Sequence, residues 1–165
     1  MIIWLASYPK SGNTWVKIFL NSILFSDGSI NINKNNIRLF PLRSDFNTLD
    51  INIDNVKEFA DNCLNAQNLI NLDNKIKFFK THNALWRLGD KSFTNEKNTL
   101  GVLHIVRDPR NIITSLKNHF NKQNYRDALI FLKDKKKSIG SRNQTGDTHL
   151  PTIISSWSNH YNSWK

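Results

Sequence analysis

Hydrophobic and polar positions divide the chain into short apolar runs and longer segments with helical spacing. The apolar runs are rich in β-branched and aromatic residues, as buried strands are, and lie at 2–7, 76–81 and 100–106. The longer segments carry apolar residues three and four positions apart, which predicts helices at 15–25, 54–70, 109–120, 125–137 and 151–165. Strands that alternate with helices predict an α/β fold with a parallel sheet.

Local signals support the predicted helix boundaries. Asp54 and Asp108 stand at the N-cap positions of the second and third helices, and Pro109 suits the first turn of the third. Residues 26–54 form a long polar connection with short elements, and residues 138–149 form a polar loop.

The loop after the first strand has the features of an anion-binding site. It offers Lys10, the flexible Gly12 and the hydroxyls of Ser11 and Thr14, directly before a helix. Unpaired N–H groups and the positive end of the helix dipole meet there, and Trp15 adds a flat face for a ring. The loop is not a Walker A motif, because its lysine precedes its only glycine. An ordinary capped turn remains the alternative.

Two further strand ends carry polar side chains. Lys80 and His82 follow the second strand, and Arg107 follows the third. In open α/β sheets the ligand crevice lies beyond the carboxyl ends of the strands. Ser115, on the helix after Arg107, would face the same crevice. The alternatives are a capping role for His82, and an ion pair for Arg107 beside a solvated Ser115.

Composition narrows the choice of ligands. The 165 residues suffice for one core, so we expect a single domain over residues 1–165. The formal net charge of +10 points to nucleotides, phosphorylated or sulfated groups, or nucleic acid. Basic and aromatic residues are not interleaved on one face, so nucleic-acid binding is not favoured. The single cysteine, Cys63, excludes an internal disulfide and a cysteine-based zinc site.

Targeting signals are not apparent along the chain. No apolar run approaches the ~20 residues of a membrane span, and the N-terminus lacks the pattern of a secretory signal. We therefore expect no membrane span and a cytoplasmic location.

The motifs, taken in order, resemble those of the cytosolic-type sulfotransferases that use 3′-phosphoadenosine 5′-phosphosulfate (PAPS). The family's Y-P-K-S-G-T-T-W is similar to residues 8–15, where Asn13 replaces a threonine. Its K-T-H or K-S-H element is similar to residues 80–82. Its R-D-P-R-N run with a following helical serine is similar to residues 107–111 and Ser115.

The resemblance implies sulfuryl transfer from PAPS to a hydroxyl or amine acceptor, without a metal. His82 would be the general base, and Lys10 and Lys80 would assist at the sulfuryl group. The implied donor-binding residues are Lys10, Ser11, Gly12, Asn13, Thr14, Trp15, Arg107 and Ser115. Of these, the loop would hold the 5′-phosphate and the tryptophan would stack on adenine, while Arg107 and Ser115 would hold the 3′-phosphate.

The family usually carries about another hundred residues, which include an R-K-G-x-x-G motif that has no match here. We therefore expect a P-loop-NTPase-like sulfotransferase fold that is truncated at its C-terminus. A non-catalytic nucleotide-binding fragment or module of that fold is the alternative function. The expected acceptor is a small molecule or a glycan, and no nucleic-acid partner is expected.

The last predicted helix carries Ser156, Trp157 and His160, which are similar to the family's S-W-x-x-H helix. Its apolar stripe, which includes Trp157, Tyr161 and Trp164, is expected to be exposed. Exposed aromatic stripes are adhesive, so the stripe predicts self-association.

Overall fold

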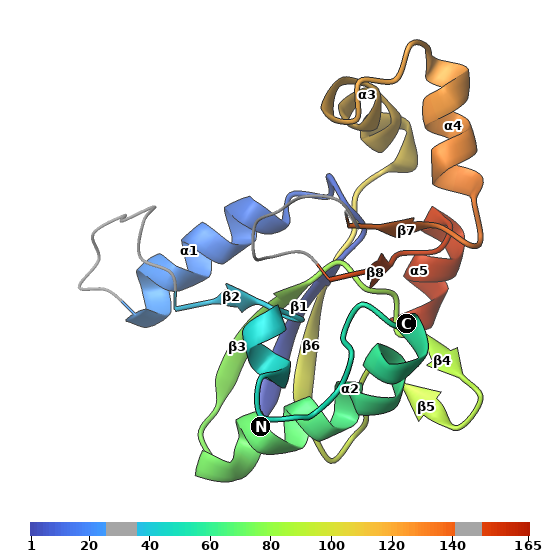
Figure 1. Ribbon diagram of the computed structural model, residues 1–165. Helices are drawn as coiled ribbons and strands as arrows, with labels where there is room; N and C mark the ends of the chain where they lie inside the picture. Colours follow the sequence, from blue (N-terminus) through green and yellow to red (C-terminus); the bar gives the residue numbers. More distant parts are fainter. Residues whose placement is uncertain (26–35, 141–149) are drawn as a thin grey trace.

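The computed structural model describes residues 1–25, 36–140 and 150–165. A parallel sheet with the strand order β2-β3-β1-β6 lies at its centre (Figure 1). In chain order these strands are β1 (Ile2–Ser7), β2 (Arg38–Leu39), β3 (Lys77–Thr81) and β6 (Thr99–Ile105). Each neighbouring pair is parallel, which confirms the predicted fold class and places the three predicted strands within one residue.

Helices and short elements surround the sheet. The helices of the described residues are α1 (Asn13–Phe25), α2 (Val56–Ile70), α3 (Pro109–His119), α4 (Tyr125–Lys133) and α5 (Trp157–Ser163). The 3-10 turns are η1 (Arg43–Phe46) and η2 (Asn71–Asp73). The short strand pairs are β4 (Arg87–Leu88) with β5 (Lys91–Ser92), and β7 (Ser138–Ile139) with β8 (Thr152–Ile153). None of the described helices is long and apolar enough to cross a membrane.

Successive residues of β3 contact different helices, because side chains alternate between the faces of a strand. The ring of Phe78 meets that of Phe25 in α1, with centroids 6.0 Å apart. The next residue, Phe79, lies in a buried cluster that contains Phe59 of α2. Helices α1 and α2 therefore cover opposite faces of the sheet.

A cluster rich in aromatic side chains forms the larger core. Trp4 lies at its centre, with ring centroids 5.1 Å from Phe93 and 5.4 Å from Phe40. Its indole N–H also donates to the Thr99 hydroxyl at 3.0 Å, so this donor is hydrogen-bonded within the core. The aromatic cluster, as we call it, comprises Trp4, Phe40, Phe46, Phe59, Phe79, Trp86, Phe93 and Trp164.

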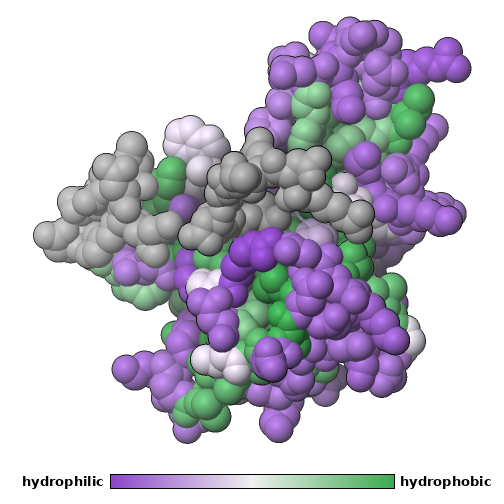
Figure 2. All heavy atoms as spheres, viewed as in Figure 1, coloured by the Kyte–Doolittle hydropathy of each residue, from purple (hydrophilic) through white to green (hydrophobic). Residues whose placement is uncertain are grey.

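A smaller core lies where α3 meets α4. Figure 2 shows apolar atoms between these two helices, while their outer surfaces are hydrophilic. Ile112 and Leu116 of α3 are fully buried there. The helical cluster, as we call it, comprises Tyr8, Ile112, Leu116, Ala128, Phe131, Leu132 and Ile154.

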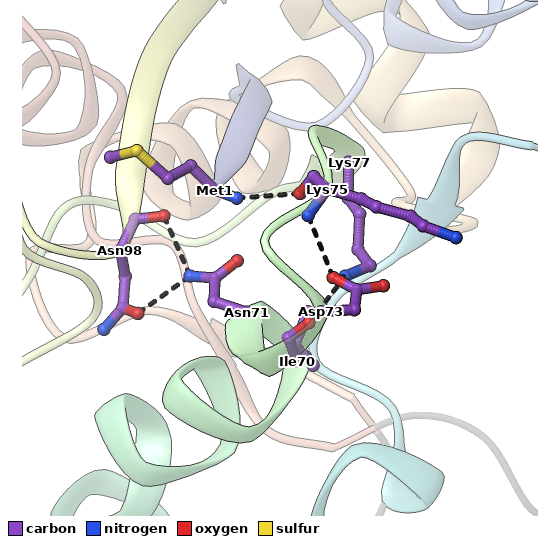
Figure 3. A network of polar contacts seen from close by, with 7 residues as sticks. All are labelled: Met1, Ile70, Asn71, Asp73, Lys75, Lys77 and Asn98. Atoms are coloured by element: carbon purple, nitrogen blue, oxygen red, sulfur yellow. Dashed lines mark hydrogen bonds and ion pairs between the residues drawn. The ribbon is translucent and has the colours of Figure 1, made fainter.

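Polar contacts tie the amino ends of the strands together (Figure 3). The N-terminal ammonium of Met1 donates to the Lys75 carbonyl at 2.8 Å. Asn71 donates its amide to the side-chain oxygen of Asn98 at 2.8 Å, and Lys77 forms an ion pair with Asp73. These bonds fix β1 and β3 at the end of the sheet opposite the predicted site.

The environment of β6 differs from the prediction of a buried strand. No residue of β6 is fully buried, and Leu100, Val102 and Leu103 are 50%, 39% and 43% exposed. The reason is its position: β6 is the last strand in the sheet order, and β1 alone pairs with it among the described residues. Apolar composition predicted the strand correctly but not its burial.

Helix α1 also exposes apolar residues. Trp15, Phe19 and Ile23, four positions apart, form an exposed stripe, while Asn13 and Asn21 are the buried residues of the helix. The helix thus faces the sheet partly through amide side chains.

The C-terminal segment differs from the prediction of one helix over 151–165. Residues of β8 pair with β7, and α5 begins only at Trp157, with Ser156 as its N-cap. The aromatic stripe is not exposed as expected: Trp164 is buried in the aromatic cluster, and Trp157 and Tyr161 are partly buried and stacked. The chain itself covers much of this surface.

Other predicted boundaries need smaller changes. Asp108 caps α3 and Pro109 lies in its first turn, as predicted. The N-cap of α2 is Asn55 rather than the predicted Asp54, because α2 begins at Val56. The Asn55 side chain accepts a hydrogen bond from the Lys57 N–H. Helix α4 ends at its Lys133 rather than at 137. Predicted connections over 26–35 and 141–149 lie outside the described residues.

Candidate active site

The carboxyl ends of β1, β3 and β6 open onto one cavity. The parallel register places Ser7 beside Ile105, and Ala6 beside Thr81, so the residues that follow these strands meet at one edge. The cavity measures about 400 Å³ and is lined by Pro9, Lys10, Gly12, Asn13, Thr14, Trp15, Lys80, His82, Arg107, Ser115, His119, Phe120 and Ile139. Nine of the ten predicted site residues therefore line the same cavity, and Ser11 is the exception.

The loop between β1 and α1 adopts a strained, anion-suited conformation. Lys10 has φ +70° and Gly12 has φ +98°, both in the left-handed region. A lysine there costs roughly 1 kcal/mol, a strain that concentrates at functional sites. The Gly12 carbonyl accepts the Trp15 N–H at 3.0 Å and starts α1. The first N–H groups of the helix lie at the cavity, where a dipole favours an anion.

Two polar side chains of the loop face inward. Asn13 donates its amide to the Leu5 carbonyl at 3.0 Å and to the Ser7 hydroxyl at 2.9 Å. The hydroxyl of Ser11 is buried and lines a separate small cavity beside Tyr8. The Asn13 amide therefore ties the loop to β1, and the Ser11 hydroxyl points away from the larger cavity in this structure.

His82 is held in one tautomer by the end of β1. Its Nδ1 lies 2.8 Å from the Ser7 carbonyl oxygen and 3.2 Å from the Ser7 hydroxyl. A carbonyl can only accept, so Nδ1 carries the proton and Nε2 keeps its lone pair. Burial, followed by the charges of Lys80 and Lys10, lowers the pKa of His82 from 6.5 to about 4. The ring is therefore neutral at pH 7 and able to accept a proton.

Two lysines supply positive charge beside this ring. Burial lowers the pKa of Lys80, and the charges of Lys17 and Lys10 lower it further. These cations lie close enough to repel one another, which is unfavourable without an anion between them. A polyanionic ligand would relieve that repulsion.

Arg107 joins the third strand end to the loop. Its guanidinium donates to the Lys10 carbonyl at 3.1 Å. No ion pair connects Arg107 to a carboxylate within the described residues, since the adjacent Asp108 pairs with Arg110 at 2.5 Å. Ser115, two turns into α3, lines the cavity as well. The arginine is thus placed by the loop and keeps further N–H donors for a second anion.

Four lining residues were not predicted: Pro9, His119, Phe120 and Ile139. His119 follows Ser115 by four residues in α3, and helical spacing alone would have placed both on one face. Ile139 belongs to β7, which packs nearby only through tertiary folding. No sequence signal pointed to it.

No group of three or more potential metal ligands occurs in residues 1–25, 36–140 and 150–165. The cavity is instead lined by lysine, arginine, histidine and backbone N–H groups. Such a donor set suits anions, and it would act on a transferring group through fixed positive charge.

A parallel sheet whose strand ends combine a loop with the features of an anion site, a lysine–histidine pair and an arginine is an α/β arrangement suited to phosphorylated or sulfated ligands. A family model described as "Sulfotransferase domain" matches residues 2–165. The chain belongs to this family, whose members are transferases that move sulfuryl groups and in general use PAPS. A comparison with curated proteins found no match.

Proposed function

We propose that this protein transfers the sulfuryl group of PAPS to a hydroxyl or amine of a small molecule or glycan, with His82 as general base. One observation carries the proposal: a neutral imidazole with a free Nε2 lies in the same cavity as Lys10, Lys80 and Arg107. An anionic donor and a proton acceptor can therefore meet there.

The donor would lie along the loop and α3. Backbone N–H groups of residues 12–14, at the start of α1, would hold the 5′-phosphate, with the Lys10 ammonium beside it. Arg107 and Ser115 would hold the 3′-phosphate, and Trp15 would stack on adenine. The side chain of Trp15 is 79% exposed, so its ring is accessible to a ligand.

During transfer, the acceptor oxygen or nitrogen forms a bond to sulfur while the bond from sulfur to the phosphate oxygen breaks. His82 would accept the acceptor's proton at Nε2. Lys10 and Lys80 would stabilise the negative charge that develops on the departing phosphate. Donor binding brings negative charge beside His82, which raises the pKa of the ring from its value of about 4 towards neutrality.

A second candidate is nucleotide binding without turnover. The cations and N–H groups that line the cavity would hold the donor whether or not transfer follows. Both candidates require donor binding, and only sulfuryl transfer requires His82.

The test is a His82→Ala variant. We expect turnover with PAPS and a panel of phenols, alcohols and amines to fall by roughly 100-fold or more, because general-base catalysis is lost. The affinity for 3′,5′-bisphosphorylated adenosine, measured by calorimetry, should change little. Retained turnover in this variant would remove His82 from the role of base. Donor binding without any turnover by the unmodified protein would instead favour the non-catalytic alternative.

A further inference from the structure

The connection that carries His82 is bonded chiefly to a distant segment of the chain. The His82 carbonyl accepts from Nε2 of His160 at 3.2 Å, which requires that nitrogen to carry the proton. The Asn83 carbonyl accepts the indole N–H of Trp164 at 2.8 Å. The Leu85 N–H donates to the hydroxyl of α5's Ser163 at 2.9 Å. Two residues of α5, together with its C-cap, thus reach residues 82–85.

Strand β8 adds two bonds to the same connection. The Ile153 N–H donates to the side-chain oxygen of Asn83 at 2.9 Å, and the Ile153 carbonyl accepts the Ala84 N–H at 2.8 Å. Asn83 is fully buried. The backbone after β3 therefore takes its course from β8 and α5 rather than from the sheet.

These bonds are protected from water. His160 is fully buried, and its ring stands edge-on to that of Tyr8 with centroids 5.5 Å apart. The Trp164 ring packs edge-on against Phe93 at 6.0 Å. Breaking a buried bond of this kind destabilises the folded protein by about 1–3 kcal/mol, because the carbonyl is left without a hydrogen-bond donor.

We propose that His160 and Trp164 are positioning residues, which hold the main chain of His82 so that its ring, bonded to Ser7, aims Nε2 at the acceptor. This inference rests on the proposed function. The ring is fixed by β1 and the backbone by α5, so the base has little freedom to turn. Misplacement by about 1 Å can cost as much as 100-fold in rate, so such a support has catalytic value.

The main test is Trp164→Phe, which keeps a ring against Phe93 but removes the N–H that reaches Asn83, together with part of the indole's volume. We expect kcat to fall about tenfold while the affinity for 3′,5′-bisphosphorylated adenosine stays within about twofold. Asn162→Ala, an exposed position on the same helix, is the matched control and should leave both values unchanged.

A second pair of variants addresses His160. His160→Gln keeps an amide N–H near the position of Nε2, whereas His160→Leu removes the donor. We expect the glutamine variant to retain most of the kcat and the leucine variant to lose it. Equal loss in both would show that packing against Tyr8, rather than the bond to His82, matters.

The pH titration of the His82 ring, followed by NMR, reports positioning without any turnover. In the unmodified protein its midpoint should lie near pH 4, and in Trp164→Phe it should rise towards 6.5 as water reaches a looser ring. Lys80 and Lys10 remain beside the ring in both proteins, so their charges cancel in the comparison. An unchanged midpoint together with an unchanged kcat would overturn the inference.

The same titration separates this inference from the proposed function. If the unmodified protein binds the donor but transfers nothing, the proposed function fails. A shift of the His82 midpoint in Trp164→Phe would still support positioning, and no shift would still refute it.

Discussion

The two hydrophobic clusters support different halves of the candidate site. The aromatic cluster lies beneath β1 and β3, and His82 follows directly from β3. The helical cluster lies beneath α3, which begins after Arg107 and carries Ser115. The proposed base and the residues proposed to bind the 3′-phosphate therefore stand largely on separate cores, which meet where His160 packs against Tyr8. The chemistry and the donor affinity should respond to mutation independently.

The clusters also differ in how they are built. The aromatic cluster joins β1, β3, α2, the β4–β5 region and Trp164, so segments from the whole chain meet in it. The helical cluster depends on α3 and α4, together with Tyr8 from the loop and Ile154. Strand β6, whose apolar side chains stay partly exposed, contributes a buried residue to neither cluster. We expect disruption of the aromatic cluster to unfold the protein, and disruption of the helical cluster to affect mainly α3 and α4.

The largest expected effect is on stability, in Trp4→Ala. Removal of this fully buried ring should lower the free energy of unfolding by about 3–5 kcal/mol, because a cavity opens at the centre of the aromatic cluster. Urea denaturation measures the loss. Leu103→Ala on β6 is the control, and should cost much less because its side chain is 43% exposed. Equal losses of unfolding free energy in the two variants would contradict the difference in burial between β1 and β6.

The next effect is on donor binding, in Arg107→Ala. Calorimetry should show a loss of about 1.5–3 kcal/mol in binding 3′,5′-bisphosphorylated adenosine, as for a charged hydrogen bond. Adenosine 5′-phosphate lacks the 3′-phosphate and should lose little. Arg110→Ala, three residues away and paired with Asp108, should leave both ligands unaffected. Equal losses for the two ligands would remove Arg107 from the 3′-phosphate site.

Acid should destabilise the protein at the buried histidines His160 and His82. The folded protein holds the pKa of His160 at about 3 and that of His82 at about 4, below the usual 6.5, chiefly through burial. The unfolded chain then binds more protons between about pH 4 and 6.5, so stability must fall as the pH falls through that window. We expect a loss of about 3 kcal/mol for each histidine across this window, at about 1.36 kcal/mol per pKa unit.

Denaturation curves at pH 7, 5.5 and 4.5 measure this slope. Asn162→Ala, which removes no titratable group, should leave the slope unchanged, whereas His160→Gln should reduce it. A slope that is the same in all three proteins would show that the buried histidine does not control acid stability.

The smallest expected effect is on the stability of the helical cluster. Ile112→Val removes one methylene from the helical cluster and should cost about 0.5–1.5 kcal/mol of unfolding free energy. If α3 positions Ser115 and Arg107, donor affinity should weaken slightly while the His82 titration stays in place. A shift of that titration would show that the two halves are coupled.

Much of the fold and most of the site followed from sequence. The three strands are predictable because buried strands need consecutive apolar residues, and the cap of α3 because Asp108 and Pro109 act over a few residues. Lys80, His82 and Arg107 converge because parallel strands end at one edge of the sheet.

The orientation and burial of the side chains did not follow from the sequence. The residues of the loop were predictable, but the inward turn of Asn13 and Ser11 depends on Leu5, Ser7 and Tyr8. Position in the sheet decides whether an apolar strand is covered, which explains the exposure of β6.

The sequence by itself determined the parallel α/β class, the candidate anion-binding loop and the identity of the residues at each strand end, because these depend on local pattern and on the geometry of parallel strands. Only the tertiary structure decided how those residues are held. The bond from His160 to the His82 carbonyl spans 78 positions, and Trp164 reaches Asn83 across 81. Contacts at such separations leave no periodic trace in a single sequence, since they depend on how β8 and α5 pack against the end of β3.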